Sequence, residues 1–177
     1  MRVIAGEFRR RVLKTLPGLS TRPTPDRLRE ALFNILAPRI EGVEFMDAYA
    51  GTGAVGIEAL SRGARRVIFI ESNRAAVDVI RQNLALLGIE KRAEVFTSKA
   101  VPVLARKSAD ILFLDPPYEL EPEYSAALSV AQAGLVLVQH SARLALQEEY
   151  GRLKRVRELK QGDNAISFYE RTNETIL

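Results

Sequence analysis

The chain contains no cysteine and no tryptophan, and His140 is its only histidine. The lack of cysteine excludes disulfide bonds, thiol catalysis and cysteine-bound metal. No apolar run approaches the roughly 20 residues that span a bilayer. Arg9, Arg10 and Arg11 interrupt the one stretch that resembles a secretory signal. We therefore expect a cytoplasmic protein.

Charge is unevenly distributed along the 177 residues. The whole chain has a net charge of +4, but residues 1–30 carry +5 and the remaining 147 residues carry −1. A basic leading segment on a neutral body indicates a polyanionic partner such as nucleic acid, although a solvated surface or a protected strand edge gives the same pattern. The candidate phosphate contacts are Arg9, Arg10, Arg11, Lys14, Arg22 and Arg27.

Length and periodicity predict one α/β domain over residues 1–177, with a basic hairpin and loop at 1–24 and a core at 25–177. The runs VIFI at 67–70, ILFL at 111–114 and LVLV at 135–138 lack polar alternation, which indicates strands covered on both faces. Helical patterns separate them, the first beginning after Thr24 as its expected N-cap and a later one after Ser72. The expected strands span 45–49, 67–70, 93–97, 111–114, 135–138, 153–159 and 165–170.

The fold class is therefore a Rossmann-like, doubly wound α/β sheet of seven strands. Five parallel strands with helical crossovers are followed by a hairpin, so the last strand is antiparallel, and helices cover both faces. An N-terminal β-hairpin precedes this sheet. Sheets of this kind bind ligands at the carboxyl ends of their parallel strands, so the candidate residues are those that directly follow each strand.

The first strand leads into a glycine-rich turn, Asp47-Ala48-Tyr49-Ala50-Gly51-Thr52-Gly53. Glycines in such a turn let the backbone approach a ligand, and the helix that follows offers free N–H groups. Glu71 follows the second strand and suits a ribose diol. The spacing Gly51-x-Gly53-x-x-Gly56, with an acid 20 residues after Gly51, also fits a dinucleotide site. However, Asp47 places an anion beside the loop, which suits an ammonium group better than a pyrophosphate.

The fourth strand ends in Asp115-Pro116-Pro117-Tyr118. Two prolines after a buried strand prevent both further pairing and an immediate helix, so the loop directs the Asp115 carboxylate and its own carbonyls into the crevice. Acceptors placed on an exocyclic amine free its lone pair and stabilise the positive charge that develops during methyl transfer. Tyr118 supplies a face for an unstacked base.

These motifs resemble the class I S-adenosylmethionine-dependent methyltransferases, and more closely the RsmD family, bacterial enzymes that methylate guanine N2 in 16S ribosomal RNA. The N-terminal Arg2-Val3-Ile4-Ala5-Gly6 and the block from Arg22 to Asn34 share this resemblance. It implies S-adenosylmethionine as cofactor, no metal, and 16S rRNA as partner, within the small ribosomal subunit or an assembly intermediate.

The resemblance also implies roles for single residues. The methionine end of the cofactor would lie on Asp47, Ala50, Gly51 and Gly53, and the ribose on Glu71. Asp115 and the Pro116 carbonyl would engage the guanine amine, with Pro117 shaping the loop and Tyr118 stacking on the base. The chain departs from the family at Ser98-Lys99-Ala100 and at Gln139-His140-Ser141, where an acid is usual, so backbone groups near Ser98 would contact the adenine.

Three other functions remain open from the sequence. An adenine-N6 methyltransferase acting on DNA or RNA uses the same four-residue motif, although 177 residues leave little room for a recognition module. A non-catalytic RNA-binding module on a methyltransferase fold is disfavoured by the intact Asp115–Tyr118 run. An NAD-dependent oxidoreductase lacks an obvious acid/base pair here.

Overall fold

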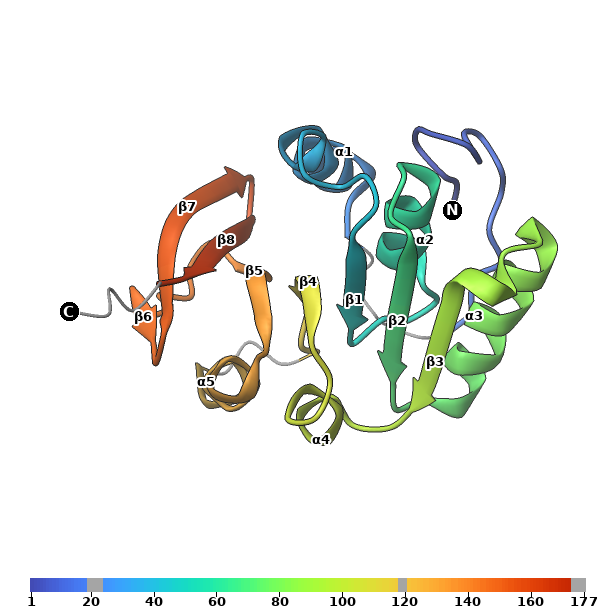
Figure 1. Cartoon of the computed structure of the whole chain (residues 1–177). Helices are drawn as coiled ribbons and strands as arrows, with labels where there is room; N and C mark the ends of the chain where they lie inside the picture. Colours follow the sequence, from blue (N-terminus) through green and yellow to red (C-terminus); the bar gives the residue numbers. More distant parts are fainter. Residues whose placement is uncertain (19–23, 118–120, 173–177) are drawn as a thin grey trace.

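The computed structural model describes residues 1–18, 24–117 and 121–172. Its centre is one eight-stranded sheet in the order β3-β2-β1-β4-β5-β8-β7-β6 (Figure 1). The strands are β1 (Glu44–Ala48), β2 (Arg66–Glu71), β3 (Ala93–Thr97), β4 (Ala109–Leu114), β5 (Ala133–Ser141), β6 (Glu149–Tyr150), β7 (Leu153–Gln161) and β8 (Asn164–Arg171). The first five are mutually parallel, whereas β8, β7 and β6 pair antiparallel with their neighbours.

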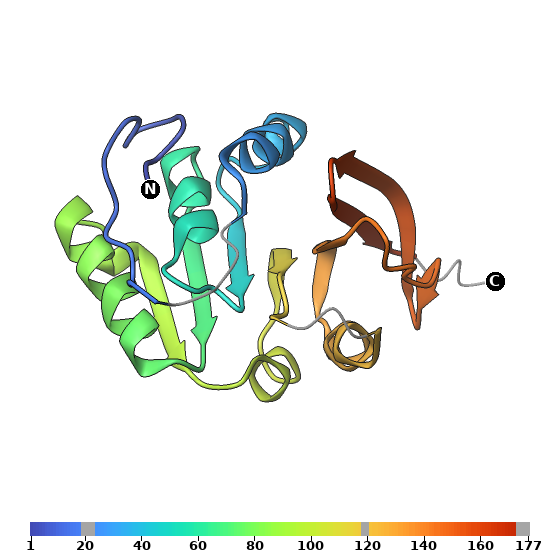
Figure 2. The same ribbon diagram turned by 180° about the vertical axis from the view of Figure 1, so that it is seen from behind.

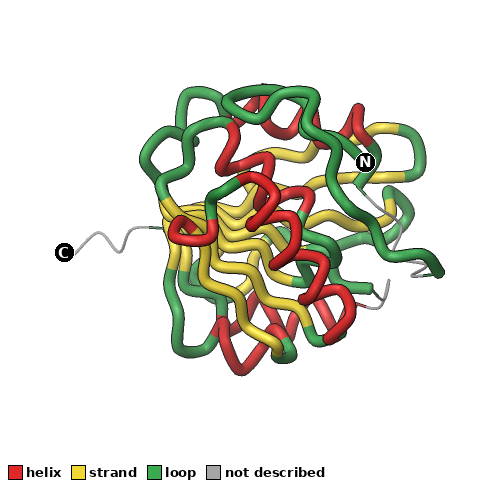
Figure 3. The backbone as a smooth tube through the Cα atoms, turned by 90° about the vertical axis from the view of Figure 1, so that its right-hand side faces the viewer, coloured by secondary structure: helices red, strands yellow, loops and turns green. Residues whose placement is uncertain are grey.

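Helices cover both faces of the sheet (Figures 2 and 3). They are α1 (Asp26–Leu36), α2 (Ala54–Ser61), α3 (Arg74–Leu87), the short 3-10 helix η1 (Glu90–Arg92), α4 (Ala100–Leu104) and α5 (Glu121–Val130). One apolar cluster joins α1, α2 and α3 to Phe45, Phe69 and Phe113. A second cluster joins α4 and α5 to the opposite face of the same strands. Burial on both faces of the sheet thus explains why the predicted strands at 67–70, 111–114 and 135–138 contain only apolar residues.

The doubly wound α/β class is confirmed, but the strand count was wrong by one. The additional strand, β6, has two residues and pairs Glu149 with Lys154 and Tyr150 with Leu153. A two-residue pairing leaves no alternation for sequence reasoning to detect. Among the described residues, no helix is both long and apolar enough to cross a membrane.

The expected N-terminal hairpin is reduced to a single antiparallel bridge, between Arg2 and Val12. Turns occupy most of the segment between these residues. Backbone hydrogen bonds join Val3 to Arg10 and Arg11 and Met1 to Leu13, and side chains of α2 hold the residues between them. The Glu58 carboxylate accepts the N–H groups of Ile4 at 2.9 Å and Ala5 at 3.1 Å, and these contacts replace the hydrogen bonds that a longer ladder would make.

Gly6 allows this segment to pack closely on α2, and we expect its replacement by alanine to loosen the segment. Its φ is +84°, and a Cβ built there would lie 1.8 Å from the backbone oxygen of Ser61. Gly42, with φ of +75°, has no described atom within 4 Å of such a Cβ. Gly6→Ala should therefore cost about 1–3 kcal/mol more unfolding free energy than Gly42→Ala, measured by urea unfolding. Equal losses would show that only the backbone strain matters.

Two helix starts differ from the sequence prediction. The N-cap of α1 is Pro25, and the Thr24 hydroxyl donates instead to Gln139 Oε1 at 2.8 Å. The N-cap of α3 is Asn73 rather than Ser72, since the Asn73 side chain accepts the N–H of Ala76. A tertiary partner on β5 thus takes the hydroxyl that local sequence assigns to the helix end.

Candidate active site

The carboxyl ends of β1, β2, β3 and β4 meet at one edge of the sheet. Ala48, the last residue of β1, pairs with both Ile70 and Leu114, and Glu71 pairs with Thr97. The strand order turns from β1–β2–β3 in one direction to β4–β5 in the other, so the switch point lies between β1 and β4. The structure therefore brings the glycine-rich turn and the Asp115 loop to adjacent strand ends.

The turn after β1 is a series of left-handed residues held by Glu71. Tyr49 has φ of 63°, Gly51 57° and Gly53 86°. Glu71 Oε2 accepts the Gly51 N–H at 2.8 Å, while its other oxygen accepts the Asn73 N–H at 2.8 Å. Because Tyr49 is not a glycine, its left-handed conformation is strained. The hydrogen bond between the Gly51 N–H and the Glu71 carboxylate fixes the part of the turn that follows Tyr49.

The two glycines of the turn, Gly51 and Gly53, and Gly56 in α2 serve different purposes. A Cβ at Gly56 would lie 2.3 Å from Phe69 Cε1, so Gly56 is needed for packing α2 on β2. Gly53 is the left-handed N-cap of α2. At Gly51 a Cβ would meet no described atom within 4 Å. Of the three, Gly51 is the position with room for a ligand beside its backbone.

Asp47 lies one residue before the end of β1 and is 1% exposed. Its Oδ2 accepts the Gly56 N–H at 2.9 Å, which caps α2 from the strand because Gly53 has no side chain to do so. Burial raises the pKa of Asp47 well above its ordinary value, the Gly56 hydrogen bond opposes this, and the negative charges of Asp115 and Glu71 add to the rise. Asp47, Asp115 and Glu71 thus lie near one another, at the carboxyl ends of β1, β4 and β2.

The raised pKa of Asp47 predicts a pH-dependent cost in stability. In the folded chain the carboxyl group favours its protonated form. The stabilisation that comes from this protonated form is therefore fully present below the unfolded pKa, about 3.9. It is lost as pH rises toward the folded pKa. Asp47→Asn keeps an acceptor for Gly56 and carries no charge. We expect this variant to gain unfolding free energy relative to the natural protein between pH 4 and pH 7 in urea titrations, whereas a pH-independent difference would contradict the assignment.

The loop after β4 begins with a half-buried Asp115, a buried Pro116 and an exposed Pro117. Because Leu114 pairs with Ala48, Asp115 begins its loop beside the turn that follows β1. Tyr118, the predicted stacking residue, lies outside the described residues. The predicted order of an acid followed by two prolines at the crevice is therefore present, while the place of the tyrosine stays a prediction.

Ser98 connects the ends of β2 and β3. Its N–H donates to the Glu71 carbonyl at 3.1 Å, and its hydroxyl donates to the Lys99 carbonyl at 3.0 Å. The half-buried Ser98 thus lies beside Glu71 at the crevice, and its role toward an adenine ring stays a prediction.

His140 is a buried structural residue of β5. Its Nδ1 lies 2.8 Å from the Ser141 carbonyl and its Nε2 2.8 Å from Ser167 Oγ. The carbonyl requires a proton on Nδ1, so Nε2 accepts from the serine. Burial lowers the pKa of His140, and both ring nitrogens have protein partners.

Among the described phosphate-contact candidates, the side chains of Arg11 and Lys14 lie along α3 rather than at the crevice itself. Arg9, Arg10 and Arg11 are exposed, and Arg11 Nη2 donates to the Leu86 carbonyl at 3.2 Å, near the end of α3 that lies away from the strand ends. Lys14 Nζ donates to Gln82 one turn closer. Arg27 is exposed on α1, and Arg22 lies outside the described residues.

Sequence reasoning missed three buried polar residues that hold the N-terminal segment: Glu58, Asn83 and Gln139. Asn83 is 0% exposed, and it occupies a core position of α3 among Ala76, Ile80 and Leu84. A polar side chain within an apolar helical stripe was the available signal. Gln139 gave no comparable signal, because its partner Thr24 is 115 positions away.

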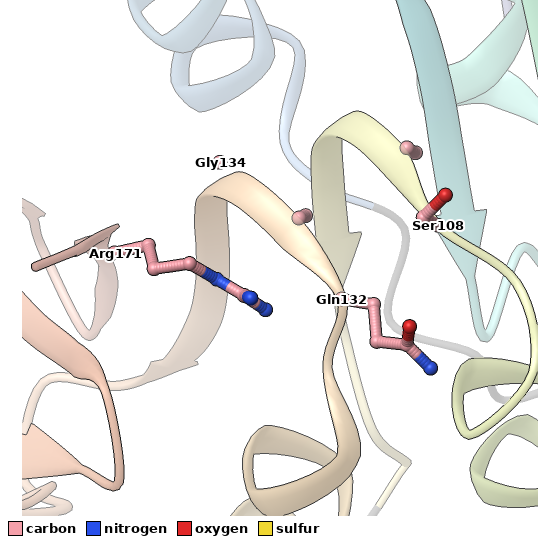
Figure 4. Close-up of a pocket in the computed structure, with 6 residues that line it drawn as sticks. Ser108, Gln132, Gly134 and Arg171 are labelled. Atoms are coloured by element: carbon pink, nitrogen blue, oxygen red, sulfur yellow. The ribbon is translucent and has the colours of Figure 1, made fainter. Parts of the chain in front are cut away.

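A hollow of about 300 Å³ lies at the opposite edge of the sheet (Figure 4). It is lined by Ser108, Ala109, Gln132, Ala133, Gly134 and Arg171. Ala109 and Ala133 begin β4 and β5, so the hollow lies at the amino ends of the parallel strands. Doubly wound sheets bind their ligands at the other edge.

Comparison with known proteins identifies the group to which this arrangement belongs. Residues 1–170 match a family model described as "Conserved hypothetical protein 95". The chain is 33% identical to "Putative rRNA methyltransferase YlbH" of Bacillus subtilis, over 97% of this chain and 99% of that protein. It is 43% identical to "Ribosomal RNA small subunit methyltransferase D" of Escherichia coli K12, over 67% of this chain and 60% of that protein.

A solved structure, "Putative methyltransferase yhhF from Escherichia coli", superposes with a TM-score of 0.86 at 32% identity, covering 98% of this chain and 99% of that one. The match therefore extends over the N-terminal segment, the parallel sheet and the C-terminal antiparallel strands. With the family model matching nearly the whole chain, this chain belongs to the RsmD/YlbH family of methyltransferases.

Proposed function

We propose that this protein transfers the methyl group of S-adenosylmethionine to the exocyclic N2 amine of a guanine in 16S rRNA. The observation that carries this proposal is the placement of Asp115-Pro116-Pro117 at the end of β4, beside the glycine-rich turn that follows β1. The Asp115 loop suits an amine whose lone pair must leave conjugation with its ring. The glycine-rich turn suits a nucleoside with a charged amino acid portion. Their adjacency brings the two reactants together.

The residues at the edge fit S-adenosylmethionine in charge and in shape. The Glu71 carboxylate, which accepts the Gly51 N–H, suits a ligand that carries an ammonium and a sulfonium group. The space beside Gly51 admits a ligand close to the backbone. Each Glu71 oxygen has capacity beyond its one backbone hydrogen bond, so ribose hydroxyls can donate to it while it holds the loop. Asp47, which is 1% exposed, contributes by capping α2 through its hydrogen bond with the Gly56 N–H.

The bound cofactor supplies an electrophilic methyl group on a sulfonium that leaves as a neutral thioether. The Asp115 carboxylate and the Pro116 carbonyl accept hydrogen bonds from the guanine amine, which turns its lone pair out of the ring plane. As the N–C bond forms and the S–C bond breaks, positive charge develops on the nitrogen, and these two acceptors stabilise it. The amine then releases one proton to solvent. The chain needs neither a metal nor a covalent intermediate for this displacement.

The choice of 16S rRNA rests on the names of the relatives and on charge. The Escherichia coli relative is named for the small ribosomal subunit. The segment of residues 1–30 carries a net charge of +5, which suits phosphate contacts that position RNA without reading its sequence.

Two measurements test the proposal. Titration with S-adenosylmethionine and with NAD separates the cofactor classes, and binding of NAD alone would contradict the methyltransferase assignment. Incubation with labelled S-adenosylmethionine and small subunits from cells that lack this enzyme, followed by nucleoside analysis, should yield N2-methylguanosine. Recovery of N6-methyladenosine would overturn the choice of acceptor.

Neutralising the three consecutive arginines should weaken RNA binding. Replacing Arg9, Arg10 and Arg11 with alanine removes up to three phosphate contacts, so the slope of log affinity against log salt should decrease by up to about 2–3. A control variant with alanine at Arg65, Arg81 and Arg106, three exposed positions scattered over the chain, has the same net charge. If both variants bind small subunits equally well, the arginines only solvate the segment.

A further inference from the structure

The side chain of Asn83 joins two segments that the proposed function assigns to different ligands. Asn83 lies on α3 and is 0% exposed. Its Oδ1 accepts the Lys14 N–H at 2.7 Å, and its Nδ2 donates to the Lys14 carbonyl at 3.1 Å. The same Nδ2 donates to the Thr52 carbonyl at 3.2 Å. One buried amide therefore holds the basic N-terminal segment and the glycine-rich turn together.

Both N–H groups of the Asn83 amide are hydrogen-bonded. An asparagine amide has two N–H groups, and here one serves each segment. If either segment moves, a buried polar atom of Asn83 loses its partner, which costs about 1–3 kcal/mol. The positions of Lys14 and Thr52 therefore depend on each other through Asn83.

The turn is held from two sides. Glu71 accepts the Gly51 N–H, and Asn83 donates to the carbonyl of the next residue, Thr52. Glu71 is also the predicted ribose contact, so a ligand that binds it orders the turn and with it the Thr52 carbonyl. Lys14, the other residue that Asn83 holds, is one of the predicted phosphate contacts. Its ammonium group donates a hydrogen bond to Gln82 Oε1.

We propose that Asn83 is a positioning residue that couples methyl-donor binding to RNA binding. This inference rests on the proposed function. A donor bound at the turn fixes Thr52, Asn83 and the Lys14 backbone, so RNA meets a segment that is already ordered. The first ligand to bind bears the entropic cost of ordering the two segments, so the second ligand binds without that cost. This gives positive cooperativity without a change of fold. By thermodynamic linkage, RNA raises donor affinity by the same factor.

The molecule contains an internal reference for this effect. Glu58 holds the same N-terminal segment through Ile4 and Ala5, and its hydrogen bond from Arg62 Nε does not involve the glycine-rich turn. A ligand at the turn should therefore tighten the segment at Lys14 more than at Ile4 and Ala5. A general stabilisation of the fold would instead act on all three amides alike.

Hydrogen exchange of the unmodified protein tests this difference. We expect saturating S-adenosylhomocysteine to slow exchange at the Lys14 amide about 5- to 20-fold, and at Ile4 and Ala5 less than about 2-fold, in line with typical coupling between sites. Equal effects at the three amides, or none at Lys14 while the compound binds, would overturn the inference. Failure of the compound to bind would contradict the proposed function instead.

A thermodynamic cycle tests the coupling itself. The affinity for small subunits from cells that lack the enzyme is measured with and without S-adenosylhomocysteine. We expect the compound to raise it about 5- to 20-fold in the natural protein and in Gln82→Ala, which removes only the contact with the Lys14 ammonium. In Asn83→Ala the ratio should fall to within about 2-fold of unity.

Asn83→Asp serves as a second variant where alanine prevents folding. It keeps an acceptor for the Lys14 N–H and loses both donors to the carbonyls, so it should also lack the coupling. A ratio that persists in the folded Asn83 variants would overturn the inference, even if both ligands bind more weakly.

Discussion

Replacing Asp115 with alanine is expected to reduce the rate of methyl transfer by at least about 100-fold, the usual loss when one preorganised group is removed from a developing charge. Asp115 directly follows β4 at the switch point of the sheet and is half-buried. Its carboxylate is the strongest acceptor that the loop offers to the attacking amine. The rate is measured under single-turnover conditions with labelled S-adenosylmethionine and small subunits.

The same substitution should leave donor affinity within about 3-fold of the natural value. The direct loop contacts of the proposed donor site, Glu71 to Gly51 and Asn83 to Thr52, do not involve Asp115. Asp115→Asn, which keeps one oxygen acceptor in the same place, should retain more activity than alanine. Asp163→Ala, on the exposed turn between β7 and β8, is the control. Unchanged turnover in Asp115→Ala would contradict the proposed role.

Replacing Glu58 with alanine is expected to cost about 3–5 kcal/mol of unfolding free energy, the range found when one partner of a buried ion pair is removed. Glu58 is 0% exposed and accepts three hydrogen bonds, from Ile4 N–H, Ala5 N–H and Arg62 Nε. The substitution leaves the two backbone N–H groups and the Arg62 guanidinium without these acceptors. Urea unfolding monitored by circular dichroism measures the loss.

A second arginine makes the loss of Glu58 more severe. Arg29 is 0% exposed, and its Nη2 donates to the Arg2 carbonyl at 2.8 Å and to Asp26 at 3.2 Å. Its Nε and Nη1 have no hydrogen-bond partner among the described residues. Burial lowers the pKa of Arg29, and the Glu58 charge is the largest of the effects that raise it. Glu58 therefore provides negative charge that the buried guanidinium needs.

Asp26→Ala provides the matched control, because Asp26 pairs with the same arginine but its side chain is 59% exposed. A solvent-exposed partner contributes less than about 1 kcal/mol. Equal losses in the Asp26 and Glu58 variants would show that burial of the carboxylate does not matter. A loss below about 1 kcal/mol for Glu58→Ala would contradict its role in holding the N-terminal segment.

The parallel sheet and its ligand edge were predictable because their signals are local. An apolar run such as 67–70 indicates a strand covered on both faces, and the helical stripe that follows indicates a crossover. Once the strands are parallel, chirality and connection rules bring their carboxyl ends to one edge. The adjacency of the turn after β1 and the Asp115 loop follows from this topology, without knowledge of any side-chain contact.

The roles within that edge were only partly predictable. The sequence did not indicate that Gly56 must accommodate Phe69 where α2 packs on β2, or that a Cβ at Gly51 would meet no described atom within 4 Å. The sequence did not indicate that Asp47 is buried and caps α2, and its predicted contact with the cofactor stays a prediction. These differences depend on distances between elements, which periodicity does not encode.

The sequence by itself determined the order of strands and helices, the family motifs and the concentration of positive charge in the first 30 residues. Only the tertiary structure decided how that segment is attached. Glu58, Asn83 and Gln139 bind it through partners that are 54, 69 and 115 positions away. Local propensity reflects interactions between residues a few positions apart, whereas a buried hydrogen bond between distant residues exists only after the chain has packed. For that reason the connection between the basic segment and the glycine-rich turn becomes visible in the folded chain alone.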